Sequence, residues 1–506
     1  MAGRIGRLHT PHGTLETPYL FPVIDPTRQT PDISFISEIG FNGIITNAYL
    51  YFRRNKGTRR PIHEYLNWSH VVMTDSGGYQ ILEYGDISVD NRTIVSFEKQ
   101  IGVDIGVILD LPTGGGVSYE EARARVYETY RRAIEALPLI MDSRQLWALP
   151  VQGAPYMDLF IRSSLLSARL PYHIYALGSP TVLLEKYDYA PIVEMTLIAR
   201  RILLPSSPIH VFGVGHPMII PFLVAAGADL FDSASYTLYA RDDRYMTESG
   251  TKRLSDLEYL PCSCPVCSKY GEARYLLELS KNERAEAIAK HNLYMLSREL
   301  RLVKQAIKEG RLWELLEYRS KAHPSLRGAF NVLVKHGGLL SRYSPVTSPE
   351  GRAVLISGSD SEANPRVRYA KKRVFKYLAG KTNRGYRKIV LIPAHKKPYT
   401  EQGEYRAILN KCGDDVLILF IHPYLGLIPP ELASTYPYYQ HEAKFAERDV
   451  SPDGIVREII RVARALSAEV VVVDEAWVDS PRIKSTLEKI KSNIRVAVSA
   501  LGSICT

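Results

Sequence analysis

The sequence predicts an α/β protein with a (β/α)8 barrel, or TIM barrel, followed by a smaller C-terminal α/β domain. Two observations carry this prediction. Eight short apolar, β-rich runs alternate with helix-like stretches over about the first 235 residues. A second, shorter α/β pattern begins at Lys388. A doubly wound open sheet is the alternative for the first part, but no Gly-x-Gly-x-x-Gly segment follows its first strand.

Each strand of the barrel is expected where apolar and β-branched residues stop at a polar or Gly-containing turn. The eight runs are Tyr19–Ile24, Gly43–Ala48, Val71–Thr74, Ile105–Leu109, Leu146–Val151, Ile174–Leu177, His210–Val214 and Leu230–Phe231. Apolar residues at helical spacing between them predict helices such as Tyr119–Leu137, Tyr156–Ala168 and Val182–Leu203.

The rest of the chain divides by composition. A long helix is expected from Lys281 to about Tyr318, and residues from His336 to Asn364 are rich in Gly, Ser and Pro, which predicts a linker. We therefore expect a catalytic barrel domain at 1–335, a basic linker or small subdomain at 336–387, and an α/β domain at 388–506. The last has expected strands at Ile389–Pro393, Val416–His422, Glu469–Val473 and Arg495–Ser499, and helices near Ile455–Leu466 and Pro481–Ile490.

The composition excludes several classes of protein. With 45% apolar and 23% charged residues, the chain is globular and not disordered. No run approaches the roughly 18 apolar residues of a membrane span, and Met1–Leu20 lacks the apolar core of a secretory signal. Five cysteines are few for 506 residues, which favours a reducing compartment. We expect a cytoplasmic protein without a membrane partner.

Positive charge is concentrated in one segment. The net charge is +10, and Arg366–Lys388 alone holds ten basic and no acidic residues, with three tyrosines and Phe375 among them. Cations contact phosphates and rings stack on unpaired bases, so the segment predicts RNA binding. The alternative is a solvated helix face or linker. A smaller basic cluster follows the second strand at Arg53, Arg54, Lys56, Arg59 and Arg60.

Polar side chains follow the predicted strands where barrel enzymes place their chemistry, at the carboxyl ends. These residues are Asp75, Asp110, Gln152, Gly178, His216 and Asp232. Because parallel strands end at one face of a barrel, we expect these residues at one mouth.

Three cysteines gather in Pro-Cys262-Ser-Cys264-Pro-Val-Cys267, and His291 follows inside a helical pattern. Three thiolates and an imidazole suit a closed tetrahedral zinc site, which makes the insertion zinc-binding and the ion structural. Iron–sulfur or redox chemistry is the alternative for the cysteines, and a helix-surface role the alternative for His291. Cys412 and Cys505 lack such neighbours and are predicted to be plain thiols.

Two aspartates carry the predicted chemistry. Asp75 stands in Thr-Asp-Ser-Gly-Gly-Tyr-Gln, where the glycines let a flat ligand approach the backbone and Tyr79 can stack on it, and Asp232 follows the eighth strand. Each could instead cap a helix. Two carboxylates in one pocket can divide a glycosyl displacement, one attacking the anomeric carbon and the other moving the proton. A barrel hydrolase acting on another glycoside would use the same pair.

At these residues the sequence resembles the tRNA-guanine transglycosylases, most closely their archaeal form. Asp75-Ser76-Gly77-Gly78-Tyr79-Gln80 is similar to the family's Asp-Ser-Gly-(Gly/Ser)-(Phe/Tyr)-Gln segment. The stretch from Phe231 to Tyr245 resembles the archaeal nucleophile region, and Leu260–Cys267 with His291-Asn292-Leu293 resembles the zinc site. The resemblance covers residues 1 to about 335.

The resemblance implies base exchange in tRNA: guanine at position 15 of the D-arm is replaced by 7-cyano-7-deazaguanine (preQ0), the precursor of archaeosine. Asp232 would be the nucleophile that bonds to ribose C1′, and Asp75 the general acid/base. The base would be bound by Ser76, Asp110, Gln152 and the backbone near Gly178, with Tyr79 stacked on its face. Neither ATP nor a redox cofactor is expected, because one glycosidic bond replaces another. The target base must leave its stack.

The C-terminal part departs from the family in two respects. Ile392–Tyr399 resembles a segment shared with archaeosine synthase, but Ala394 follows Pro393 where the synthase has a Cys nearby, so no catalytic thiol is expected. No PUA domain, the usual RNA-binding end of archaeal members, is recognisable, and a separate PUA protein is a hypothetical partner. The family implies a homodimer. A non-catalytic tRNA-binding subunit or a synthase-like paralogue remains the alternative function.

Overall fold

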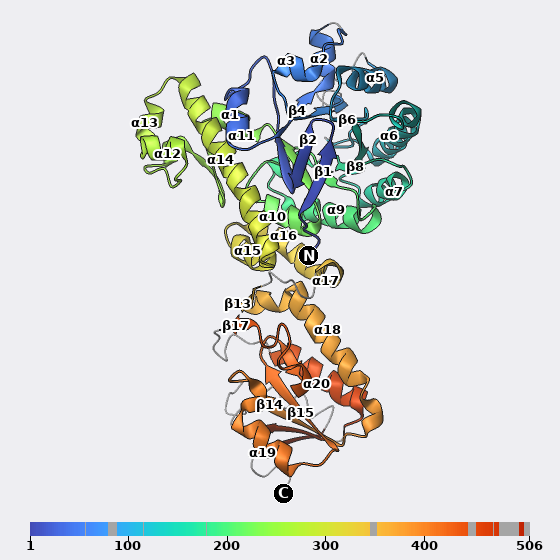
Figure 1. The fold of residues 1–506 in the computed structure, drawn as a ribbon, viewed down its shortest axis with the longest axis vertical. Coiled ribbons are helices and arrows are strands. Elements are labelled where there is room, and N and C mark those ends of the chain that lie inside the picture. The colour runs from blue at the N-terminus through green and yellow to red at the C-terminus, as the bar shows by residue number, and fades with distance from the viewer. Residues whose placement is uncertain are drawn as a thin grey trace. The chain divides into compact units, whose positions relative to one another are not determined.

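The computed structural model describes residues 1–55, 57–78, 89–114, 116–178, 180–344, 352–443, 452–468, 470–474 and 495–499. They form two units, Met1–Lys308 with Tyr318–Leu333, and Glu309–Glu317 with Val334–Thr506. Each unit has its own sheet (Figure 1). Within the described part of the chain, no helix has the length and apolar character that crossing a membrane requires.

Eight parallel strands form the barrel of the first unit in the order β3-β10-β9-β8-β7-β6-β5-β4. The sheet closes where Val23, just past β3, forms a parallel bridge with Ile45, and the Ile24 N–H donates to the Ile45 carbonyl at 2.8 Å. This closure confirms the barrel and excludes the open sheet. The strands are β3 (Tyr19–Pro22), β4 (Gly43–Asn47), β5 (Val71–Asp75), β6 (Ile105–Val107), β7 (Leu146–Val151), β8 (Ile174–Leu177), β9 (Ile209–Val211) and β10 (Leu230–Ser233).

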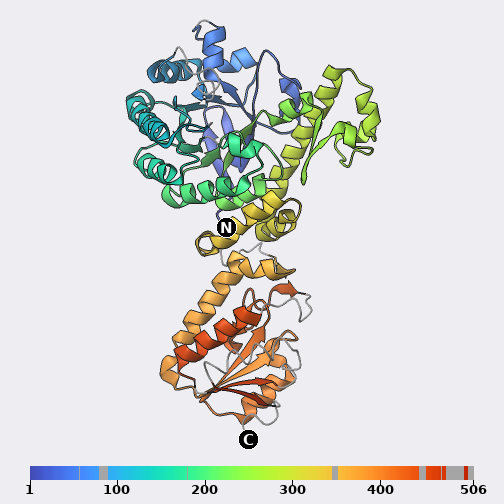
Figure 2. The same ribbon diagram turned by 180° about the vertical axis from the view of Figure 1, so that it is seen from behind.

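Helices surround the barrel (Figures 1 and 2). They are α1 (Ile33–Glu38), α2 (Ala48–Arg54), α3 (Ile62–Leu66), α5 (Asn91–Ile101), α6 (Tyr119–Ile140), α7 (Met157–Ser167), α8 (Thr181–Glu185), α9 (Tyr189–Ile202) and α10 (Ile220–Ala226). The prediction of one helix over Val182–Leu203 was wrong. Tyr187 adopts a left-handed φ of 57°, which no α-helix accommodates, so the chain breaks into α8 and α9.

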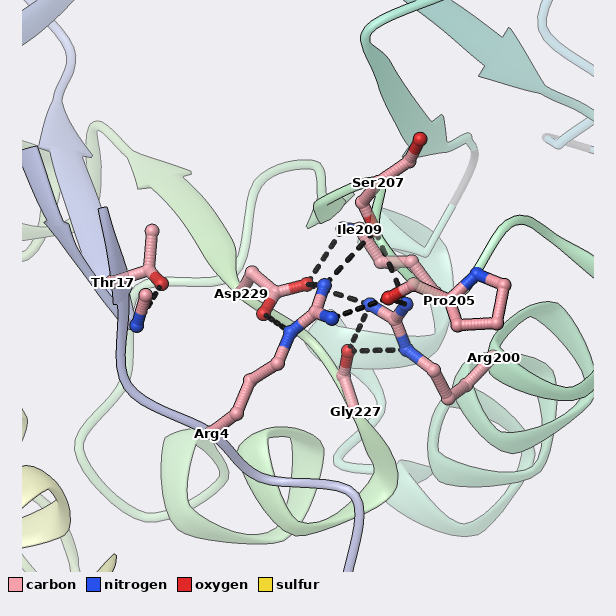
Figure 3. A network of polar contacts seen from close by, with 9 residues as sticks. Arg4, Thr17, Arg200, Pro205, Ser207, Ile209, Gly227 and Asp229 are labelled. Atoms are coloured by element: carbon pink, nitrogen blue, oxygen red, sulfur yellow. Dashed lines mark hydrogen bonds and ion pairs between the residues drawn. The ribbon is translucent and has the colours of Figure 1, made fainter. Parts of the chain in front are cut away.

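Carboxylates at the amino ends of two strands stabilise the bottom of the barrel. Asp229, just before β10, accepts from Arg4 Nε at 2.8 Å, Arg200 Nη2 at 2.6 Å and the Ile209 N–H at 3.0 Å (Figure 3). Asp104, just before β6, accepts from the Val72 N–H at 2.8 Å and also from two histidines. The hairpin of β1 (Gly6–Thr10) and β2 (Gly13–Thr17) precedes β3. The buried carboxylates of Asp229 and Asp104 are therefore paired with donors and have a structural role.

Beyond the barrel strands, the first unit continues with α11 (Ser235–Arg241), the hairpin of β11 (Arg244–Thr247) and β12 (Gly250–Arg253), and then α12 (Pro265–Tyr270) and α13 (Ala273–Leu277). The long helix α14 (Lys281–Lys308) packs against α11 and carries α12 and α13 near its amino end (Figure 1). The predicted helix up to Tyr318 was too long, because Gly310 has a positive φ of 70° and separates α14 from α15 (Leu312–Ser320). Helix α16 (Pro324–Lys335) follows.

The second unit contains a five-stranded sheet in the order β16-β15-β14-β18-β19, parallel except for the β15–β16 pair. Its strands are β14 (Lys388–Pro393), β15 (Val416–His422), β16 (Gly426–Ile428), β18 (Val470–Asp474) and β19 (Arg495–Ser499), and β13 (Val354–Ile356) pairs with β17 (His441–Ala443). Helices α18 (Pro365–Ala379) and α20 (Pro452–Leu466) pack together (Figure 2), and α19 (Gly403–Lys411) follows β14. The helix predicted near Pro481–Ile490 lies outside the described residues.

The segment from His336 to Asn364, for which the composition predicts a linker, includes regular secondary structure among its described residues. It contains α17 (Gly337–Tyr343), strand β13 and a 3-10 turn at Ser359–Ala363. Val354 and Ile356 are buried in the core of the second unit, which explains why the strand forms despite its Gly- and Ser-rich surroundings.

The prediction that Cys412 is a plain thiol was wrong, because this residue is disulfide-bonded. Cys505, the other cysteine predicted to be a plain thiol, lies outside the described residues.

Candidate active site

The strand ends bring the predicted polar residues to one mouth of the barrel. Asp75 is the last residue of β5, and Asp232 lies within β10 one residue before its end. Asp110, Gln152 and Gly178 come shortly after β6, β7 and β8. The charges of both Asp110 and Asp232 act on Asp75, so the three carboxylates share one electrostatic environment.

Asp75 is positioned by the neighbouring strand. Asn47, its register partner on β4, donates from Nδ2 to Asp75 Oδ2 at 3.2 Å, while Asn47 Oδ1 caps α2 by accepting from the Leu50 N–H at 2.8 Å. The cap fixes the orientation of the amide, so its donor faces Asp75. Sequence reasoning did not single out Asn47, although its place at the end of a β-run was the available signal.

The pKa of Asp75 is raised from 3.8 to about 7. Desolvation by burial is the largest cause, followed by the negative charges of Asp110 and Asp232. Backbone N–H groups of Gly77 and Ser76 oppose the rise. A carboxyl group with this pKa holds a proton near neutral pH and can also release it, which suits a general acid/base.

Asp232 is buried and held by two donors on a single oxygen. His210 Nε2 lies 2.8 Å from Asp232 Oδ1, and the Gly213 N–H donates to the same oxygen at 3.0 Å. Oδ2 makes no hydrogen bond with any described residue. One carboxylate oxygen is therefore anchored while the other keeps its lone pairs for a reacting atom.

The surroundings of His210 define its tautomer. His210 is fully buried on β9, its ring lies parallel to Phe21 at 6.1 Å and 4.8 Å from Phe212, and Nδ1 has no partner among the described residues. Because a carboxylate only accepts, the proton must be on Nε2, pointing at Asp232. His210 was missed by sequence reasoning, since its contact depends on the pairing of β9 with β10.

Asp110 and Gln152 form the second half of the site. Gln152 Nε2 donates to Asp110 Oδ2, and Gln152 Oε1 accepts from the Thr113 N–H at 3.2 Å, which fixes the orientation of the amide. Burial raises the pKa of Asp110 to about 6, although the Gln152 hydrogen bond lowers it. The pair presents carboxylate and amide groups of the kind that bind a purine-like edge.

Glycines 78 and 178 leave room for these two side chains. A Cβ on Gly78 would stand 2.2 Å from Asp110 Oδ1, and one on Gly178 would stand 2.1 Å from Gln152 Nε2. Any larger residue would displace the polar groups of the site. The space at Gly78, expected to admit a ligand, therefore first accommodates the Asp110 side chain.

The remaining predicted residues lie in different surroundings. Ser76 is buried, and its hydroxyl donates to the Ile108 carbonyl at 3.1 Å. His216 Nε2 lies within hydrogen-bond distance of the Thr251 hydroxyl on β12, at 2.8 Å, so this side chain contacts the hairpin beyond the barrel. Burial lowers the pKa of His216 to about 4. Tyr79 lies outside the described residues, as does Lys56 of the smaller basic cluster.

The four predicted metal ligands meet at one point. One ligand atom each from Cys262, Cys264, Cys267 and His291 lie within 4.8 Å of one another. The Cys264 and Cys267 sulfurs are 3.6 and 3.4 Å from His291 Nδ1. Three soft sulfur donors and one imidazole nitrogen are the donor set of a closed tetrahedral site.

A hydrogen bond at Nε2 orients the His291 ring so that Nδ1 faces the three cysteines. His291 Nε2 lies 2.9 Å from the Met246 carbonyl, which requires the proton on Nε2 and leaves the Nδ1 lone pair facing the sulfurs. Tyr245 stacks on the imidazole at 3.6 Å, and its hydroxyl lies 3.1 Å from Cys267 Sγ. The hairpin β11–β12 therefore orients a ligand carried by α14.

Comparisons with known proteins show which family the chain resembles. The family model described as queuine tRNA-ribosyltransferase matches residues 1–325. A tRNA-guanine(15) transglycosylase of Aeropyrum pernix is 44% identical over 91% of this chain and 88% of its own length. Proteins with the same name from Pyrobaculum aerophilum and Methanosarcina mazei are 42% and 35% identical, over 88% and 98% of this chain and 89% and 96% of their own.

Proposed function

The chain belongs to the queuine tRNA-ribosyltransferase family, and from this premise we propose that it exchanges guanine at position 15 of the tRNA D-arm for 7-cyano-7-deazaguanine. The relatives named tRNA-guanine(15) transglycosylase support the position and the class of substrate. The observation that carries the proposal is the group of three carboxylates at one mouth, in which Asp75 interacts with both Asp110 and Asp232.

The reaction uses the two different environments of the aspartates. Asp232 Oδ2 attacks ribose C1′, a C–O bond forms, and the C1′–N9 bond of guanine breaks with its electron pair leaving on the base. Asp75 supplies the proton to the departing guanine and later accepts the ring N–H proton of the incoming base, whose nitrogen displaces Asp232 from C1′. Its pKa of about 7 supports both roles.

The base is held by groups around the carboxylates. We assign Asp110, Gln152 and the Gly178 backbone to hydrogen bonds with its edge, with Ser76 nearby and Tyr79 on its face. The Gln152–Asp110 hydrogen bond and the Thr113 contacts fix the orientation of both groups, which favours a single orientation of the ligand.

The Cys262, Cys264, Cys267 and His291 cluster is proposed to hold one structural zinc ion. Three thiol groups and an imidazole whose Nδ1 lone pair faces them form a donor set that suits zinc. A bound ion would link the α12 segment to α14. It takes no part in the exchange, which needs only the carboxylates.

Two further properties are proposed. The chain works in the cytoplasm, where its tRNA substrate is found, and it forms a homodimer near the zinc segment. Exposed apolar side chains there support the dimer, including Tyr259 at 67% and Tyr275 at 42% exposure. Light scattering of the purified chain would check the dimer.

Incubation with unmodified tRNA and radiolabelled guanine tests the proposed function. We expect the wild-type chain to incorporate label and to form a covalent enzyme–RNA adduct that survives denaturing electrophoresis. Asp232→Ala should show neither, a loss of at least about a thousandfold in rate. Asp142→Ala, which removes an exposed carboxylate in the turn after α6, is the matched control and should behave as wild type.

Three outcomes would contradict the proposal. Binding of tRNA without incorporation would indicate a non-catalytic subunit or a synthase-like paralogue. Release of guanine to water without labelled product would indicate a hydrolase. An adduct that persists in Asp232→Ala would place the nucleophile at another residue.

A further inference from the structure

A groove in the second unit lies between α18 and the segment 432–438. Its cavity measures about 350 Å³, at the lower end of the size of small-ligand pockets. The matched family model stops at residue 325, so it assigns no role to this region. One wall of the groove belongs to the basic segment Arg366–Lys388.

One face of α18 forms the first wall. Arg366, Tyr369, Arg373, Lys376 and Tyr377 line the cavity, and their spacing of three or four residues and its multiples places them on one helical face. Cations and rings alternate along this face, with the Arg373 guanidinium 5.9 Å from the centre of the Tyr369 ring. Tyr436 and Tyr438 face them from the second wall.

The cations of the basic segment differ in how they are used. Lys371 pairs with Glu362, Lys381 pairs with Glu431, and Arg368 donates to the Val334 carbonyl. In contrast, Arg373 and Lys376 are exposed and form no ion pair with a described residue. Lys372, Arg384 and Arg387 are also exposed and form no ion pair with a described residue, so the groove holds part of the unneutralised charge of the segment, at Arg373 and Lys376.

The second wall contains an unused polar group. Tyr438 is 3% exposed, and its hydroxyl makes no hydrogen bond with any described residue. A buried hydroxyl without a partner is energetically unfavourable. The hydroxyl oxygen has almost no accessible surface, so Tyr438 contributes its ring to this wall of the groove.

We propose that this groove binds one unpaired nucleotide of the tRNA substrate, with its base stacked on Tyr369 and its phosphate at Arg373 and Lys376. The inference rests on the proposed function for its choice of RNA. An acidic peptide would pair with the cations but would not stack on the rings, whereas a single-stranded nucleotide pairs its phosphate with the cations and stacks its base on a ring.

The test measures tRNA binding by the full chain with four variants. Tyr369→Ala should weaken binding about tenfold, and Tyr369→Phe, which keeps the ring, less than about twofold. Arg373→Ala should weaken binding about fivefold and lower the slope of log Kd against log salt by about one. Arg406→Ala removes an exposed cation from α19 outside the groove and should bind as wild type.

Competition identifies the occupant. A single-stranded oligoribonucleotide should displace tRNA less effectively from Tyr369→Ala than from wild type, while a duplex of the same length should not distinguish them. Equal weakening by Tyr369→Phe and Tyr369→Ala, equal effects of Arg373→Ala and Arg406→Ala, or equally strong competition by poly-glutamate would each overturn the proposal. Unchanged melting temperatures show that the variants are folded.

The binding result is separate from the result for base exchange. If the wild type binds through the groove but incorporates no guanine, the catalytic proposal fails and only the RNA-binding inference stands. If it incorporates guanine and the groove variants bind normally, the groove inference fails alone. If both proposals hold, Tyr369→Ala raises KM for tRNA about tenfold and leaves kcat within about twofold.

Discussion

The two aspartates that we propose to be catalytic differ because their neighbours differ. Asp75 is surrounded by negative charge and poor solvation, which raises its pKa to about 7, whereas Asp232 Oδ1 accepts from His210 and from the Gly213 N–H. The donors hold the carboxylate of Asp232 in one orientation. They leave Oδ2 free to act as the attacking oxygen in the proposed reaction, in which His210 would be a positioning residue that acts through Asp232.

Replacing His210 tests this role. His210→Leu removes the donor at similar volume, and we expect covalent adduct formation to slow by about 10- to 100-fold, with little change in KM for tRNA. His210→Gln can still donate from Nε2 and should recover most of the rate. Rapid-quench measurement of the adduct provides the rate constant.

A purely structural role of His210 predicts another result. In that case both variants would lower the melting temperature together, and the rate of adduct formation at saturating tRNA would match wild type in the folded fraction. Equal rates for His210→Leu and His210→Gln would also contradict the donor role.

At the scale of single residues, the sequence indicated which side chains reach the mouth but not how they are held. Asp75, Asp110 and Gln152 could be found because each follows an apolar run, and strand ends have a known place in a barrel. Asn47 and His210 could not be assigned their roles, because these depend on cross-strand register and on amide or imidazole orientation. The space left by Gly178 likewise becomes apparent only when Gln152 is in place.

At the scale of elements, strands were predicted better than helix boundaries. An apolar run ends sharply at a polar turn, and all eight predicted runs overlap the strands β3 to β10. Helical periodicity continues through a short break, so the turn at Tyr187 and the turn at Gly310 were both missed. Each break depends on one left-handed residue, which hydrophobic spacing does not reveal.

The proposed metal site would stabilise the segment that contains the cysteines, because it joins short helices that have little core of their own. Helix α12 has six residues and α13 has five, too short to be stable alone. Metal binding at such a site contributes on the order of 10 kcal/mol. The proposed ligands come from the α12 segment and α14, and the β11 backbone orients His291.

Removing the metal should therefore loosen this segment. Elemental analysis should find one zinc ion per chain, and a strong chelator should lower the melting temperature by several degrees and expose 254–280 to proteases. Cys267→Ser should reproduce the effect, while Ser263→Ala, between two ligands, should not. A chelated protein with unchanged melting and proteolysis would contradict a structural metal.

At the scale of the whole molecule, the chain passes between its two units three times, because 309–317 belongs to the second unit and 318–333 to the first. Trp313 is fully buried in the second unit, with Nε1 donating to Glu317 Oε1 at 3.0 Å and the Asp360 carbonyl at 3.3 Å. Six residues later, Arg319 pairs with buried Glu299 of the first unit at 2.9 Å. Helix α15 therefore contributes residues to both cores.

This path predicts that the barrel cannot be isolated cleanly by cutting the chain after Leu333. The fragment would keep Trp313 but lose Asp360 and the serines that hydrogen-bond Glu317, which leaves a large apolar ring exposed. We expect aggregation and red-shifted tryptophan emission. The shift would report Trp313, because the fragment's other tryptophans, Trp68 and Trp147, are buried in the barrel. Trp313→Gln in the fragment should abolish the shift and improve solubility. A monomeric fragment whose emission is the same with and without Trp313→Gln would show that the second unit does not hold this residue.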